Sequence, residues 1–290
     1  MAAFPNTQGF DLMLFSKSRT FSYKSALLFA LFCSLNSTAG GRADDGGISF
    51  GGSPHLLKGH ASVTMESEVV SIDVHDKVIK VDCRFLFHNH GPKCVVRMGF
   101  PDQGLGASEP YQGFPVPTGP GLKATFLSYD SYVDGKKVPT KLVPTNDRSL
   151  YWHTKTVTFK ANSDCNIRDI YTLPPGAQVT SENGMYNQTY YVLHTGASWH
   201  GPIGKAEINV KFAPDVLTQP IHLVASNALP EGQKFPDLKW SKLPVGTVIY
   251  AGPSEPKLDG KTLSFTKTNF RPDEKDDVHL FYGYRQLTNM

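Results

Sequence analysis

Residues 190–212 read YYVLHTGASWHGPIGKAEINVKF, and this stretch decides the fold class. Polar and apolar residues alternate on both sides of a connection rich in glycine and proline, which is typical of two strands joined by a compact turn. The second run has one polar face and one apolar face. Gly196 and Gly201 flank Trp199 within the connection, and a purely solvated loop needs no such aromatic anchor. We therefore predict a hairpin corner held by a buried indole.

The same alternation recurs along the rest of the chain, roughly every ten residues, between segments rich in Gly, Pro, Asn and Asp. Asp134-Gly135 and Asp259-Gly260 each lie between two such runs, where the dipeptide predicts a tight hairpin turn. The only helical candidate is a short segment at 213–219. These patterns predict an all-β protein, an antiparallel β-sandwich of two lobes with little or no helix.

The expected organisation has four parts. Residues 1–43 are a signal peptide with its cleavage region, and residues 44–59 are a mobile lead-in. Residues 60–147 form an N-terminal β-sandwich lobe, and residues 148–290 form a C-terminal β-rich lobe. Whether the two lobes share a sheet is left open by the sequence.

The N-terminal segment has the features of an export signal. Three basic residues precede an apolar run at 26–35, and small residues follow it at cleavage-type positions. The apolar run is shorter than the about 20 residues that a membrane span needs, so we expect cleavage and no transmembrane span afterwards. Loss of residues 1–43 removes four basic residues and one acidic residue, so the formal charge of +3 becomes about zero. A neutral mature chain without a basic stripe argues against nucleic-acid binding.

Three cysteines follow the leader, namely Cys83, Cys94 and Cys165. An exported compartment permits disulfides, so one pair and one free thiol is the simplest expectation. If residues 83–98 form a hairpin, the two sulfurs of Cys83 and Cys94 are several residues apart along the strands, which disfavours that pair. Cys165 could then pair with Cys83 or Cys94, and the sequence does not choose between them. We take Cys94 with Cys165 as the possible disulfide.

Candidate catalytic and metal sites are few. Ser198 follows Gly196 in a superficial nucleophile elbow, but the elbow needs a glycine at His200 and a helix afterwards, where a strand is predicted. His88 and His90 are spaced to chelate a metal, although turn histidines are the favoured interpretation. The acidic run 273–277 could bind Ca²⁺, but it lacks a glycine-turned loop and is expected to be a solvated turn. No pattern predicts a cofactor.

The long Pro/Gly-rich segment 101–121 is the expected ligand-binding element. It is too long for a simple connection and lacks any period, so it is either a lid or a loop draped over the sandwich. Tyr111 and Phe114 in this segment, together with Trp199, are the candidate ligand-binding residues.

Several motifs support a family comparison. The segment FLFHN at 85–89, then MGFP at 98–101 and YVDGK at 132–136, and later TGASWHGPI at 195–203, resemble a bacterial secreted family known only as a domain of unknown function. More remotely they resemble the vault/inter-α-trypsin (VIT) domain, a resemblance that implies two Ig/VIT-like lobes. The resemblance covers most of the chain from about residue 60, and implies export and a β-rich fold. It brings no catalytic residues with it.

The resulting hypothesis is an exported, non-catalytic β-sandwich protein that acts as a structural or binding module in the periplasm, cell envelope or extracellular space. Its partner would be an envelope or extracellular protein or a glycan. The alternative is a secreted carbohydrate- or peptide-active hydrolase or binding protein that uses the 101–121 segment.

Overall fold

A computed structural model describes residues 50–58, 61–103, 126–144, 150–180, 182–218, 220–225 and 239–287. The predicted leader, residues 44–49 of the lead-in, and Tyr111 and Phe114 lie outside these residues. The expected mobile lead-in was wrong for residues 50–58, because they form strands β1 (Phe50–Gly52) and β2 (His55–Lys58), each paired within a sheet. Ala43–Met290 forms one compact unit. The described part is all-β, and its helical elements are the short 3-10 turns η1 (His194–Ser198), η4 (Trp240–Lys242) and η5 (Glu274–Asp276). The predicted all-β sandwich is confirmed, whereas segment 213–218 forms turns instead of a helix.

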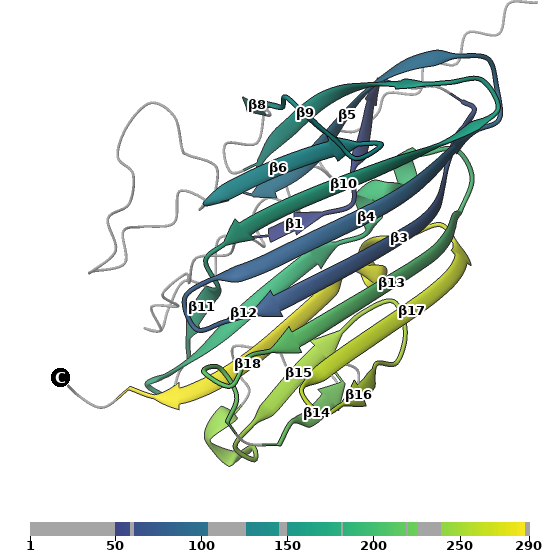
Figure 1. Ribbon diagram of the computed structural model, residues 1–290. Coiled ribbons are helices and arrows are strands. Elements are labelled where there is room, and N and C mark those ends of the chain that lie inside the picture. Colours follow the sequence, from purple (N-terminus) through teal and green to yellow (C-terminus); the bar gives the residue numbers. More distant parts are fainter. Residues whose placement is uncertain are drawn as a thin grey trace, which may run out of the picture. The chain divides into compact units, whose positions relative to one another are not determined.

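The largest sheet has eight strands and lies at the front of Figure 1. Its order is β16 (Lys257–Asp259), β17 (Thr262–Phe270), β13 (Ile203–Phe212), β3 (Val63–Val74), β4 (Ile79–Asn89), β10 (Ser163–Leu173), β6 (Ser128–Val133) and β7 (Lys136–Val138). Neighbouring strands are antiparallel except β13 and β3, which run parallel. Strands from both sides of the expected lobe boundary near residue 147 therefore belong to one sheet.

Two further sheets complete the sandwich. A six-stranded sheet has the order β1 (Phe50–Gly52), β12 (Gly184–Val192), β18 (Val278–Gln286), β15 (Thr247–Ala251) and β14 (His222–Ala225), with β11 (Gly176–Val179) also paired to β12. A four-stranded sheet has the order β2 (His55–Lys58), β5 (Cys94–Gln103), β9 (Leu150–Phe159) and β8 (Lys141–Pro144).

The core lies between the eight-stranded sheet and the other two. Phe212 of β13 packs edge-on against Tyr282 of β18 at 5.2 Å between ring centroids. Phe100 of β5 packs in the same way against Tyr171 of β10, also at 5.2 Å. Buried residues from each of the three sheets contribute to one large hydrophobic cluster, so apolar burial holds the layers together.

A charged contact also joins two of the sheets. Lys155 of β9 donates from Nζ to both carboxylate oxygens of Asp169 on β10, at 2.5 and 2.7 Å, and to Ser131 Oγ at 2.7 Å. Both charged side chains are fully buried. The carboxylate and the hydroxyl satisfy the buried ammonium group, which would otherwise carry a large desolvation cost.

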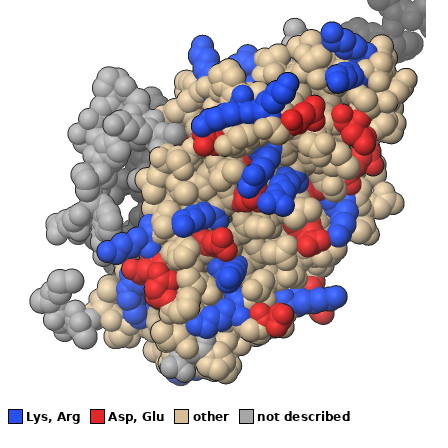
Figure 2. All heavy atoms as spheres, viewed as in Figure 1, with Lys and Arg blue, Asp and Glu red and all other residues tan. Residues whose placement is uncertain are grey.

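The outer face of the eight-stranded sheet carries charges of both signs, and Figure 2 shows them interspersed. Arg168 donates to Asp82 through Nε at 2.8 Å and Nη2 at 2.7 Å, across neighbouring strands. Because charges of opposite sign are paired, this face is polar but does not carry a large electrostatic field of one sign.

The three cysteines are buried free thiols, so the predicted disulfide between Cys94 and Cys165 is not formed. Cys165 lies on β10 opposite Phe87, whereas Cys94 lies on β5 opposite Phe159 in a different sheet. The expected hairpin between β4 and β5 was also wrong, because β4 pairs with β3 and β10. Burial raises the pKa of Cys165 to about 12, so this thiol stays protonated.

The predicted turn glycines adopt the expected backbone. Asp134 and Gly135 both have positive φ, 48° and 76°, as a type I′ turn between β6 and β7 requires. Gly260, with a φ of 56°, turns the chain between β16 and β17. Gly201 also has a positive φ, of 70°, in the turn between η1 and β13.

Candidate functional site

The stretch 190–212 connects two sheets. β12 ends at Val192 in the six-stranded sheet, η1 follows, and β13 begins at Ile203 in the eight-stranded sheet. The expected hairpin was wrong, because these strands belong to different layers. The alternation of β13 is as predicted from Lys205 onward.

Trp199 anchors this corner from the inside. Its side chain is 2% exposed, and its ring centroid lies 4.5 Å from that of Phe87. Its indole Nε1 donates to the backbone oxygen of Pro54 at 2.7 Å. A buried indole whose N–H is already bonded cannot serve as an open ligand platform.

Asp277 orients His194 in the same corner. The carboxylate of Asp277 is almost fully buried and accepts from the backbone N–H of Leu193 at 2.8 Å and of His194 at 3.0 Å. It also lies 2.7 Å from His194 Nδ1. Because a carboxylate only accepts, Nδ1 carries the proton, and Nε2 of the neutral ring is left as an acceptor. The acidic run 273–277 is a turn between β17 and β18, as expected, and its first three residues are exposed. Its last two carboxylates, those of Asp276 and Asp277, are buried, which the expected solvated turn did not include.

An aromatic platform lies beside His194. Trp152 of β9 lies across Gly99 of β5, where an added Cβ would come within 3.0 Å of the indole. His55 of β2 stacks on Trp152 at 5.3 Å between centroids and 25° between planes. Gly99 therefore lets the indole lie close against the sheet, and a larger residue at this position would displace it.

These side chains line one apolar hollow of about 440 Å³ between the four-stranded and six-stranded sheets. Its lining combines the Trp152 platform, His55 and His194 with Pro101, Val192, Thr195, Ala197 and Ser198. Burial lowers the pKa of His55, the bond to the backbone oxygen of Thr195 acts against this, and a protonated His194 would lower the pKa further. The neutral form of His55 is therefore favoured, which suits an uncharged ring in the hollow.

Ser198 is not arranged as a nucleophile. Its Oγ donates to the backbone oxygen of Thr195 at 2.9 Å and accepts from the N–H of Leu56 at 2.8 Å. The Ser198 hydroxyl thus links η1 to β2. Among the described contacts it makes no hydrogen bond to His194, which bonds to Asp277 instead. The prediction that residues 196–200 are not a nucleophile elbow agrees with this geometry.

A buried acid lies beneath the hollow. Glu68 is fully buried between the sheets, where it accepts from Tyr191 OH at 2.6 Å and from Ser53 Oγ at 2.8 Å. The backbone oxygen of Ser53 accepts from Thr195 Oγ1 at 2.6 Å. Burial raises the pKa of Glu68 to about 7, against which the two hydrogen bonds act. Ser53 therefore links the floor of the hollow to a core carboxyl group.

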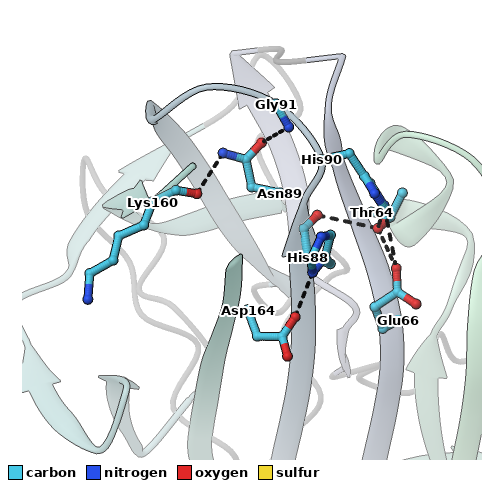
Figure 3. A network of polar contacts seen from close by, with 8 residues as sticks. All are labelled: Thr64, Glu66, His88, Asn89, His90, Gly91, Lys160 and Asp164. Carbon is cyan, nitrogen blue, oxygen red and sulfur yellow. Dashed lines mark hydrogen bonds and ion pairs between the residues drawn. The ribbon is translucent and has the colours of Figure 1, made fainter. Parts of the chain in front are cut away.

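The two candidate metal ligands meet in space, but on the surface (Figure 3). His88 and His90 have ring centroids 4.4 Å apart. His88 Nδ1 lies 2.7 Å from Asp164, and His90 Nε2 lies 3.9 Å from Glu66 and 3.0 Å from Thr64 Oγ1. Within the described ranges no three His, Cys, Asp or Glu side chains are grouped so as to hold a metal ion. The cluster is a set of exposed polar pairs.

Sequence reasoning missed Trp152, His55 and Asp277. They lie in three separate segments, and only the folded sheets bring them to His194. The available signal was Trp152 itself, at a polar-facing position of a predicted strand, where a large aromatic residue is unusual. Among the residues that the structure describes, no helix is long and apolar enough to cross a membrane.

No family model and no curated protein matches the chain. Its structure is similar to that of a Legionella pneumophila protein described as a "putative nutrient binding protein", with 17% identity, a TM-score of 0.59, and coverage of 82% of this chain and 72% of that one. It also matches leukotriene A4 hydrolase from Saccharomyces cerevisiae at 8% identity and a TM-score of 0.36, over 79% of this chain and 30% of the hydrolase. An M1 zinc metallopeptidase from Deinococcus radiodurans matches at 9% identity and a TM-score of 0.31, over 77% of this chain and 43% of the peptidase. The chain spans less than half of each of these two enzymes, and only the Legionella structure supports a shared fold.

Proposed function

We propose that the protein is a non-catalytic binding module whose ligand presents a flat ring to the platform of Trp152 and His55. The observation that carries this proposal is the indole laid across Gly99 beside an imidazole that Asp277 orients. An aromatic face and one fixed polar group are the elements by which small-molecule sites obtain affinity and orientation. The Legionella protein of similar fold is described as binding a nutrient, which supports the same class of role.

The module would act after export, in the periplasm, the cell envelope or the extracellular space. The basic and apolar pattern of residues 1–43 supports this location, as does the resemblance to a secreted family of unknown function. N-terminal sequencing of the exported protein should show a chain that begins shortly after residue 39 or 43. Full-length chain found only in the cytosol would contradict export.

The hydrolase alternative has one supporting observation, the His194–Asp277 pair, which orients an imidazole as a general base needs. Its obvious nucleophile, Ser198, is bonded to the backbone on both sides instead. The expected lid residues Tyr111 and Phe114 lie outside the described residues and add nothing to either alternative. A binding role therefore accounts for more of the observed contacts at the site than the hydrolase alternative does.

Calorimetry with simple phenols and methyl pyranosides tests the platform. A phenol presents a flat aromatic ring, a pyranoside presents the apolar C–H face of its chair, and neither is a zwitterion. We expect binding of one class, and a loss of roughly tenfold or more in Trp152→Ala, since ring stacking contributes about 0.5–1.5 kcal/mol beyond area burial. Thr158→Ala is the matched control, because Thr158 is exposed on the same strand. Unchanged affinity in Trp152→Ala, or no binding of either class, would refute the proposal.

A further inference from the structure

A second, smaller hydrophobic cluster lies outside the main core, around η4. Trp240 stacks on Tyr186 of β12 at 4.7 Å between centroids and on Tyr284 of β18 at 5.8 Å. The three rings are nearly parallel, with interplanar angles of 22° and 15°. Trp240 itself is 1% exposed. The stack is a rigid aromatic wall, and it plays no part in the hollow beside η1.

This wall carries a buried donor that lacks an acceptor. Trp240 Nε1 has no hydrogen-bond partner among the described residues, and neither has the hydroxyl of fully buried Tyr282. An unsatisfied buried donor costs about 1–3 kcal/mol, so the indole N–H calls for an acceptor from outside the described residues, such as a water or a bound molecule. Tyr282 packs against Phe212 in the main core, so the indole N–H is the unsatisfied donor that belongs to this wall.

A hollow of about 410 Å³ adjoins Trp240. Asp76 and Asp215 line it with carboxylates, and the N–H of Asp76 donates to Asp215 Oδ2 at 3.3 Å. Arg285 lines it with a guanidinium group, whose Nη2 makes a weak contact of 4.0 Å with Met185 Sδ. The remaining lining includes Leu217 and Leu243. The volume is that of a small-molecule site, and both signs of charge are available within it.

We propose that this hollow binds a small zwitterion of the amino-acid type with an apolar side chain. The ammonium group would lie against Asp76 and Asp215, and the carboxylate would accept from Arg285 and from the indole N–H of Trp240. The apolar side chain would pack on Leu217 and Leu243. The ligand supplies the acceptor that the buried indole lacks, which a purely apolar or purely cationic ligand would not do.

The probes are L-leucine, 3-methylbutan-1-amine, which lacks the carboxylate, and 4-methylpentanoate, which lacks the amine. We expect calorimetry to show that L-leucine binds and that each truncated analogue binds at least about tenfold more weakly, because each loses a charge-assisted contact. Equal binding of all three compounds would show that only the alkyl group is recognised. That result, or no binding of L-leucine at millimolar concentration, overturns the proposal.

Variants locate the site. Arg285→Gln and Asp215→Asn change exposed side chains and should each weaken L-leucine binding. Trp240→Phe keeps an aromatic ring in the stack but removes the N–H together with part of the indole, and should also weaken binding. Glu255→Gln is the matched control, because Glu255 is exposed and does not line the hollow. Trp152→Ala should leave L-leucine binding unchanged, which separates this proposal from that for the η1 hollow. Wild-type affinity in both Arg285→Gln and Asp215→Asn would refute it.

Discussion

Glu68 is the residue whose position was least predictable. Alternation along β3 would place even-numbered residues near its start on the polar face, but a register shift between Met65 and Ser67 inserts one extra residue opposite β4. The bulge reverses the alternation, so Glu68 points inward with Val70 and Ile72. A single-residue bulge has no signature in composition, which is why the pattern predicted the strand but not the buried acid.

The buried carboxyl group makes stability depend on pH. The pKa of Glu68 rises from 4.5 to about 7 on folding, so the folded state holds its proton more tightly than the unfolded state. The contribution of Glu68 to the free energy of unfolding is therefore largest below pH 4.5, and it falls as the pH rises towards 7. The expected loss is about 3 kcal/mol in the free energy of unfolding.

Urea unfolding of the wild type and Glu68→Gln between pH 4.5 and 8 measures this effect. The difference between the two proteins should shift in favour of the variant as pH rises, because glutamine does not ionise. Other titrating groups are common to both proteins and cancel in the difference. A difference that stays constant across the range would show that Glu68 ionises with an ordinary pKa.

At the scale of elements, short connections were the main source of error. The segments between β4 and β5, β9 and β10, and β12 and β13 all look like hairpin turns in the sequence, yet each joins strands of different sheets. A compact Gly- or Asn-containing turn can link two paired strands or arch from one layer to the other. Only the pairing partners distinguish these cases. The Asp-Gly turns were predicted correctly because their chemistry specifies the hairpin itself.

The corner at η1 should depend on Trp199 for stability. Trp199→Ala would remove a fully buried ring and leave the oxygen of Pro54 without its donor. Truncation of a buried aromatic residue typically costs about 3–5 kcal/mol, so a large fall in the thermal midpoint is expected. Trp152→Ala is the comparison, because Trp152 is partly exposed and should lower the midpoint much less. A Trp199→Ala protein that melts like wild type would show that the indole does not hold the corner.

At the scale of the molecule, the predicted sandwich was confirmed but the arrangement of its halves was not predictable. Strands on both sides of residue 147 build the eight-stranded sheet, with parallel pairing between β3 and β13 across more than a hundred residues of chain. Local patterns carry no information about such distant pairing. The same holds for both hollows, whose lining residues come from segments far apart in the sequence.

The shared sheet predicts that the described unit unfolds cooperatively. The main core draws on all three sheets, and the Lys155–Asp169 pair joins two of them, so neither half buries its own core independently. Two single-tryptophan proteins test this, one retaining Trp199 in the main core and the other Trp240 in the smaller cluster, with the other tryptophans changed to phenylalanine. For each protein, the urea midpoint measured by tryptophan fluorescence should equal the midpoint measured by far-UV circular dichroism. Separate transitions, with the Trp240 cluster melting first, would mean that the six-stranded sheet folds as an independent unit.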